Sequence, residues 1–86
     1  MYVIAVYDIN EKRVGKMLKL CRQYLNWIQN SVFEGEISDV TLKELKHRAK
    51  KIMKDEDSLI FFMSRDQKWL EKDVLGKDKN PVDTVL

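Results

Sequence analysis

Hydrophobic residues form two short continuous runs in this chain. The run Tyr2–Tyr7 is apolar on both faces and rich in β-branched and aromatic residues, and Ser58–Met63 is similar. Runs of this kind are typical of central strands that helices cover on at least one side. We therefore expect these two segments to be neighbouring strands of one sheet.

Two other segments repeat their apolar residues at intervals of three and four. The first, about residues 11–25, has Val14, Met17, Leu18, Cys21 and Leu25, and the second, about residues 39–53, has Leu42, Leu45, Ala49, Ile52 and Met53. This spacing predicts two amphipathic helices that each turn one stripe toward the core. Ser38 or Asp39 is the expected N-cap of the second helix.

The remaining segments are shorter. Residues 27–37 predict two strands joined by a bend at Gln29-Asn30-Ser31. Residues 69–75 fit an extended edge piece or a helical turn that ends at Gly76, and the tail closes on Thr84-Val85-Leu86.

The resulting order is strand, helix, two strands, helix, strand, with a trailing segment. It predicts an α+β fold, a ferredoxin-like βαββαβ sandwich with two helices on one face of an antiparallel sheet and a C-terminal extra strand. We expect one domain over residues 1–86. The other sheet face would be exposed and apolar, which predicts a homodimer. Residues 77–86, with Val82, Val85 and Leu86, are then expected to pair with the partner protomer.

The composition indicates the cellular compartment of the protein and how its fold is stabilised. With 86 residues, 44% of them hydrophobic, the chain has enough apolar residues for a single small hydrophobic core. Its single cysteine, Cys21, cannot form an internal disulfide and is expected to be a buried thiol in a reducing compartment. The first apolar run lacks the features of a signal peptide, and no later run has the ~20 residues of a membrane span. We expect a cytoplasmic protein without a membrane partner.

Positive charge is concentrated on the two predicted helices, although the net charge is only +2. Lys12, Lys16 and Lys19 lie opposite the apolar stripe of the first helix, with Arg13 on its flank. The solvent face of the second helix carries Lys43, Lys46, Arg48, Lys50, Lys51 and Lys54. These faces are either solvated surfaces or a track that contacts phosphates of a nucleic acid.

Asp8 is the first candidate for chemistry, because it ends the first apolar strand. Open α/β sheets usually bind ligands at such strand ends, but the carboxylate could equally cap the following helix. The sequence has no cluster of residues in metal-ligand spacing and no glycine-rich phosphate loop. A twofold axis near Asp8 would supply a second carboxylate, and Mg²⁺ accepts one or two carboxylates together with water.

Two motifs carry a resemblance to a known family. The segments Val6-Tyr7-Asp8-Ile9 and Gln29–Gly35, supported by Val74-Leu75-Gly76, resemble the CRISPR-associated protein 2 family over essentially the whole chain. The resemblance implies a homodimer that acts with the CRISPR-associated protein 1 integrase in the capture of new spacers.

The resemblance also implies an activity and a site. Members have been assigned metal-dependent phosphodiesterase activity on single-stranded RNA or double-stranded DNA, with the strand-end aspartate as the ligand of Mg²⁺, or alternatively Mn²⁺. Here that residue is Asp8, shared with Asp8 of the second protomer. Ser31 and Phe33 match the second motif and Asn10 and Arg13 the first loop, so with Lys16 and Lys19 they are the expected nucleic-acid contacts.

Three functions remain open from the sequence. The first is a Mg²⁺-dependent endonuclease, and the second is a non-catalytic dimeric scaffold that bridges DNA along its lysine-bearing helices. A small regulatory domain that binds a metabolite is the third, and it is disfavoured because no apolar ligand pocket with convergent polar groups can be drawn.

Overall fold

Four strands form one antiparallel sheet, and sequence order is not kept across it. β1 (Tyr2–Asp8) lies between β3 (Val32–Glu36) and β4 (Ser58–Ser64), while β2 (Asn26–Gln29) pairs with the outer edge of β3. The computed structural model describes residues 1–80.

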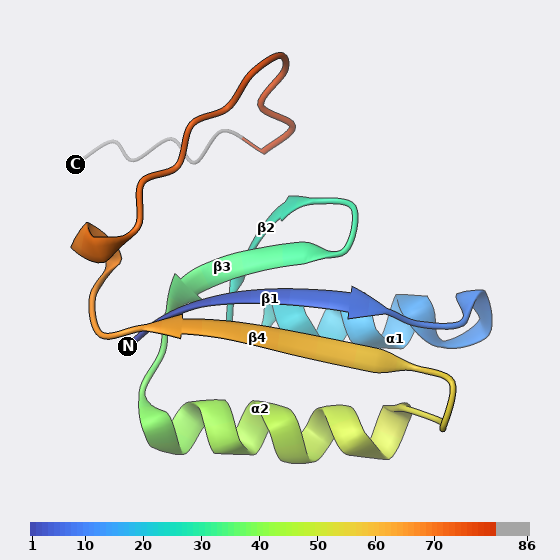
Figure 1. Ribbon diagram of the computed structural model, residues 1–86. Coiled ribbons are helices and arrows are strands. Elements are labelled where there is room, and N and C mark those ends of the chain that lie inside the picture. The colour runs from blue at the N-terminus through green and yellow to red at the C-terminus, as the bar shows by residue number, and fades with distance from the viewer. Residues whose placement is uncertain (81–86) are drawn as a thin grey trace.

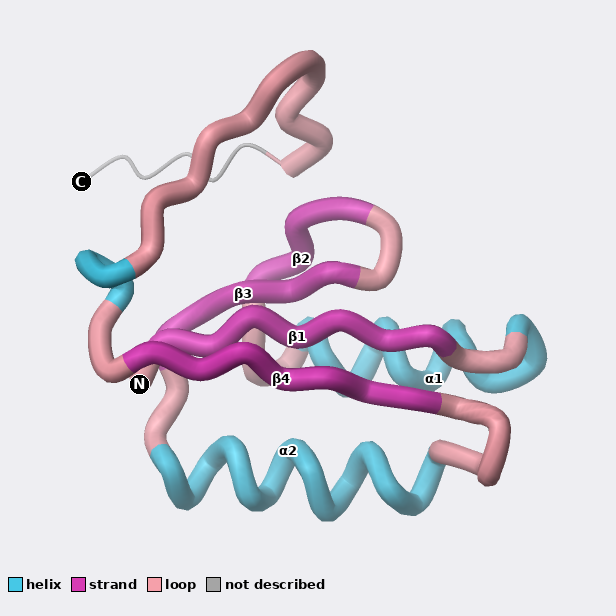
Figure 2. Tube along the Cα trace, viewed as in Figure 1, coloured by secondary structure: helices cyan, strands magenta, loops and turns pink. Residues whose placement is uncertain are grey.

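Both helices lie on the same face of this sheet. α1 (Glu11–Arg22) and α2 (Asp39–Ile52) run side by side beneath it, as Figure 1 shows. The strand order β2-β3-β1-β4 confirms the predicted ferredoxin-like sandwich. The helices leave the other face of the sheet without a layer of regular structure, as the tube in Figure 2 also shows.

The core lies between the helices and the sheet. Alternate residues of β1, namely Val3, Ala5 and Tyr7, face the helices and are at most 5% exposed. The helices contribute Met17, Leu20, Cys21, Leu42, Leu45 and Ala49. The burial of these residues confirms most of the two predicted apolar stripes. An amphipathic helix gains most of its stability by burying one such face.

One position of the first stripe was predicted wrongly. Val14 is 37% exposed, whereas Leu20, which the predicted stripe omits, is only 3% exposed. The reason is that α1 packs against α2 as well as against the sheet, so its buried face is rotated toward its neighbour.

Cys21 is a buried thiol in the core, as predicted. Burial raises the pKa of this thiol to about 11, because the charged thiolate would be separated from water. We therefore expect no reaction of native protein with Ellman's reagent at pH 8, and one equivalent of thiol released in denaturant. Fast labelling of the native protein would show that α1 separates readily from the sheet.

The hairpin between β2 and β3 turns at the predicted bend. Asn30 has a φ of 44°, in the left-handed region that asparagine tolerates better than most residues. Gly35 then permits a close approach of the chain, since a Cβ added there would lie 3.3 Å from Leu25 Cδ2. Both residues belong to the second motif, and each permits a backbone conformation or a close approach of the chain that most other residues would hinder.

Beyond β4, residues 65–80 add no strand to the sheet of their own protomer. A short 3₁₀ turn (Gln67–Trp69) follows β4, and residues 70–80 form no strand. They run over the open side of β2 and β3 (Figure 1). There the Lys72 amine donates to Glu34 Oε2 at 2.7 Å, and the Asn80 side-chain amide donates to the Trp27 carbonyl. Since these contacts use side chains, this segment adds no strand to a sheet edge.

The predicted pairing of Val82, Val85 and Leu86 lies outside the described residues. Over the part that is described, no helix is long and apolar enough to cross a membrane.

Candidate functional site

Asp8 is the last residue of β1 and lies on the face of the sheet that the helices leave open. It is exposed, and its neighbour in the β1–β4 ladder is Ser58, the first residue of β4. The preceding Tyr7 points to the opposite face, where it is 5% exposed and burial raises the pKa of its hydroxyl. Strand alternation therefore keeps Asp8 in water and Tyr7 in the core.

The alternative role of Asp8 as a helix cap is wrong. Asn10 is the N-cap of α1, and its Oδ1 accepts a hydrogen bond from the Lys12 amide at 3.0 Å. None of the side-chain hydrogen bonds or ion pairs among residues 1–80 involves the Asp8 carboxylate. The carboxylate thus remains free to bind something from outside the chain.

A single Asp8 fits a divalent cation only in part. Among the described residues, no group of three or more His, Cys, Asp or Glu side chains could hold a metal ion. One accessible carboxylate is nevertheless a hard oxygen donor of the kind that Mg²⁺ binds while it keeps several waters. The donor set of one protomer therefore suits Mg²⁺ better than Zn²⁺, and a second copy of Asp8 would have to come from another chain.

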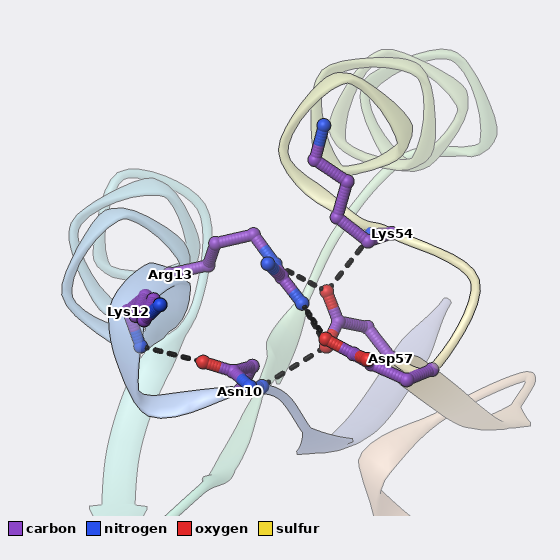
Figure 3. Close-up of polar contacts among 6 residues, drawn as sticks. Asn10, Lys12, Arg13, Lys54 and Asp57 are labelled. Carbon is purple, nitrogen blue, oxygen red and sulfur yellow. Dashed lines mark hydrogen bonds and ion pairs between the residues drawn. The ribbon is translucent and has the colours of Figure 1, made fainter.

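A partly buried ion pair joins the first turn of α1, shortly after Asp8, to the residue before β4. Arg13 Nε donates to Asp57 Oδ2 at 2.7 Å and its Nη2 donates to Asp57 Oδ1 at 3.0 Å (Figure 3). The same carboxylate accepts the backbone amides of Asn10 and Lys54, both at 2.9 Å. The Asp57 side chain is fully buried, and Glu56 adds a further contact to the Arg13 guanidinium at 2.6 Å.

These contacts join the two turns that flank Asp8 and Ser58. The hydrogen bonds from Arg13 hold the pKa of Asp57 far below its usual range, and the two carboxylates raise the pKa of Arg13. The Arg13 guanidinium is therefore committed to protein carboxylates. Its predicted contact with nucleic acid has no support in this arrangement, and Arg13 is better described as a residue that fixes the β1–α1 turn.

The remaining predicted contacts do not converge on Asp8. Phe33 is completely buried and stacks on Tyr7 with ring centroids 6.2 Å apart, so its predicted contact with nucleic acid is wrong. Ser31 is half-buried in the hairpin turn, where its carbonyl accepts from the Tyr7 amide at 3.1 Å. Lys16 and Lys19 are exposed, but they lie on the helix side of the molecule.

Two carboxylates with specific roles were missed from the sequence. Asp57 was not singled out in the sequence, although it directly precedes the first residue of β4. Glu34 is 9% exposed, and it accepts hydrogen bonds from the Tyr2 hydroxyl and from the Lys72 amine. The Lys72 contact could not be found by spacing, because the two residues are 38 positions apart.

An apolar patch shares the open face with Asp8. Ile60 and Phe62 of β4 are 50% and 58% exposed, and they alternate with core residues in the same way as Ile4 and Val6 of β1. Patches of this kind mark interaction surfaces in soluble proteins. The patch lies next to the half of the face that residues 70–80 cover.

Comparison with known proteins gives a consistent result. The sequence model of the family described as CRISPR associated protein Cas2 matches residues 1–72. A protein of Dictyoglomus turgidum, named CRISPR-associated endoribonuclease Cas2, is 46% identical over 87 residues, which span all of both chains. A protein of Thermotoga maritima with the same name is 48% identical over 80 residues, which cover 92% of each chain.

Comparison with solved structures indicates the same family as the sequence matches. The chain is similar to a structure described as cas2, with a TM-score of 0.88 and 45% identity over 100% of this chain and 98% of that one. It is also similar to Streptococcus pyogenes Cas2 at pH 6.5, with a TM-score of 0.73 and 33% identity over 88% of this chain and 100% of that one.

Proposed function

This chain belongs to the CRISPR-associated Cas2 family, and on that premise we propose that it is a metal-dependent nuclease that hydrolyses phosphodiester bonds at Asp8. The observation that carries the proposal is the Asp8 carboxylate, which is exposed at the end of a central strand without a partner in the described part of the chain. Relatives named as endoribonucleases make single-stranded RNA the first substrate to test, with duplex DNA as the second.

The residues of this chain would hold and orient the reacting groups. Asp8 would bind Mg²⁺, or Mn²⁺ in its place, which when bound supplies Lewis-acid stabilisation of charge on a phosphodiester. The hydrogen bonds that the Asn10 amide and the Arg13 guanidinium donate to Asp57 would keep the turn after Asp8 in one conformation. Such restraint favours catalysis, because small displacements of a ligand reduce rates strongly.

A homodimer would place two copies of Asp8 on one ion. Support comes from the apolar patch on the open face, since Phe62 and Ile60 would become buried together with the surroundings of Asp8. The dimer interface would then also form the walls of the site, and neither protomer would contain a complete site alone.

We expect Phe62→Glu to convert the dimer into a monomer, because a carboxylate buried at the interface would lack a partner. Light scattering after size exclusion should then give about the monomer mass of 10.2 kDa, with wild type at twice that value. Val40→Glu is the matched control, since Val40 is 77% exposed at the start of α2. A dimer that persists in Phe62→Glu would contradict an interface at the open face.

A role in spacer acquisition is the wider part of the proposal. We propose that the dimer acts with the CRISPR-associated protein 1 integrase, and family membership is the support for this partner.

A second function, a non-catalytic scaffold that bridges DNA, is favoured by one specific observation. The polar neighbour of Asp8 in the sheet is Ser58, and among residues 1–80 no group of three or more His, Cys, Asp or Glu side chains could hold a metal ion.

One assay separates the nuclease from the scaffold. Labelled single-stranded RNA and duplex DNA are incubated with the dimer in Mg²⁺, in Mn²⁺ and in EDTA, and the products are resolved on denaturing gels. Cleavage that requires the metal supports the nuclease. Binding in EDTA without cleavage under any metal condition would reject the nuclease and leave the scaffold.

A further inference from the structure

Ser58 lies beside Asp8 in the sheet, and the two side chains share the open face. The β1–β4 ladder pairs Asp8 with Ser58, and both residues are exposed. The neighbouring pair, Tyr7 and Leu59, packs toward the helices. Because strand alternation turns successive pairs to opposite faces, Asp8 and Ser58 both point away from the core, with their Cβ atoms about 5 Å apart. One carboxylate and one hydroxyl thus stand side by side at the end of the ladder.

The Asp57 carboxylate fixes the backbone on both sides of this pair. Asp57 directly precedes Ser58, and its Oδ1 accepts a hydrogen bond at 2.9 Å from the backbone amide of Asn10, two residues after Asp8. Its Oδ2 accepts the Lys54 amide at 2.9 Å, which closes the turn before β4 (Figure 3). Two groups that are held in this way can act on one small ligand, because binding costs them little further ordering.

The fold of residues 1–80 makes no use of the Ser58 hydroxyl. Other serines of β4 and α2 do use theirs: Ser64 Oγ donates to the Asp66 carbonyl at 3.1 Å, and Ser38 Oγ accepts the Thr41 amide at 3.1 Å as the N-cap of α2. None of the side-chain hydrogen bonds within the described residues involves Ser58. Its hydroxyl is therefore available to a group from outside the chain.

We propose that Ser58 is a positioning residue of the Asp8 site, whose hydroxyl accepts a hydrogen bond from a water of the divalent cation that Asp8 binds. The inference rests on the proposed function, since it requires a cation at Asp8. Mg²⁺ and Mn²⁺ prefer oxygen ligands, and Mg²⁺ keeps several of its waters when one or two carboxylates bind it. A serine hydroxyl has two acceptor lone pairs for such a water. In a homodimer the cation faces two carboxylates and two hydroxyls.

The test measures cation binding without nucleic acid and without cleavage. Mn²⁺ is titrated into the dimer, and the free ion is followed by its electron paramagnetic resonance signal. We expect Ser58→Ala to raise the Kd for Mn²⁺ about 10-fold, as residues that support a metal ligand commonly do. Ser58→Thr keeps the hydroxyl and should stay within about threefold of wild type. Ser64→Ala, at the other end of β4, is the matched control and should leave the Kd unchanged.

Ser58→Asp tests the same geometry from the opposite direction. A second carboxylate opposite Asp8 should lower the Kd for Mn²⁺ at least about 10-fold, because it adds a charged oxygen ligand. In EDTA the variant should melt below wild type, since two like charges then face each other across the ladder. Added Mn²⁺ should raise its melting temperature more than that of wild type. An unchanged Kd in Ser58→Asp would overturn the proposal, because Ser58 would then not face the cation.

Asp8→Asn separates this inference from the proposed function. If Asp8→Asn weakens Mn²⁺ binding and Ser58→Ala does not, the role of Ser58 is wrong while the cation site stands. Binding that Asp8→Asn leaves unchanged would reject the site itself, and with it both proposals.

The mass of each variant is measured by light scattering and its melting temperature by circular dichroism. Loss of the dimer in Ser58→Ala, or weak binding that Ser58→Thr does not restore, would show that Ser58 acts through packing, and would also overturn the inference.

Discussion

Asp8→Asn is expected to reduce metal-dependent cleavage at least about 100-fold while the dimer and its melting temperature are retained. The amide keeps the size of the side chain but lacks the negative charge that a divalent cation requires. Replacing a residue that merely supports a metal ligand typically reduces activity about 10–100-fold, and loss of the ligand itself reduces it more. Because the carboxylate has no partner among residues 1–80, its replacement leaves no buried group unsatisfied. Initial rates with RNA and with duplex DNA, at several Mg²⁺ concentrations, measure the effect.

The control for this experiment is Asp55→Asn, which removes the same charge from the turn before β4. Asp55 is exposed. We expect its cleavage rate to stay within about twofold of wild type, since exposed charges are screened by salt over about 10 Å. If both variants lose cleavage to the same extent, the effect is one of general charge, and Asp8 is not a metal ligand. Full activity in Asp8→Asn would also show that Asp8 is not a metal ligand.

Asp57→Asn is expected to lower the midpoint of thermal unfolding by at least about 10 °C. The amide cannot accept both donors of Arg13, so a guanidinium with only 17% of its side chain exposed keeps Glu56 alone as a carboxylate partner. Asp55→Asn again serves as the control, with an expected change of at most about 2 °C. Circular dichroism on heating measures both, and equal midpoints for wild type and Asp57→Asn would show that the ion pair does not stabilise the fold.

The same pair predicts a dependence on pH. The pKa of Asp57 in the folded protein lies far below the value of about 3.9 in an unfolded chain, so its stabilising contribution is complete above that unfolded value. The contribution is lost as the pH falls through the folded pKa. The difference in melting temperature between wild type and Asp57→Asn should therefore be constant from about pH 5 to 8 and should shrink below about pH 4.

The fold was predictable because its signals are local. Two apolar runs and two helical stripes gave the order of elements, and the topology of the sheet follows from that order. The error at Val14 has a tertiary cause, since the buried face of α1 is set by its contact with α2. The extra C-terminal strand stays a prediction, because its expected pairing is with a partner protomer, whereas residues 70–80 attach to their own sheet through the side chains of Lys72 and Asn80.

The candidate site was predictable only in its central residue. Asp8 follows an apolar strand, and this is visible in the sequence. The partners of Asp57 are 44 and 47 positions away at Arg13 and Asn10, so only the fold brings them together. For Phe33, the resemblance predicted a contact with nucleic acid, and burial shows a different role: this part of the second motif builds a hairpin and the core instead of a binding surface.

Residues 65–80 have a consequence for how this protein can be shortened. By crossing β2 and β3, they leave only the β1–β4 half of the open face available, and they keep Glu34 satisfied through Lys72. A protein cut after β4 would retain the four strands of the sheet and both α-helices, yet it would have a second adhesive surface, and Glu34 would lose Lys72 as its partner. Its self-association would lose the selectivity that brings Asp8 to a twofold axis, and we expect mixed aggregates in place of a defined pair.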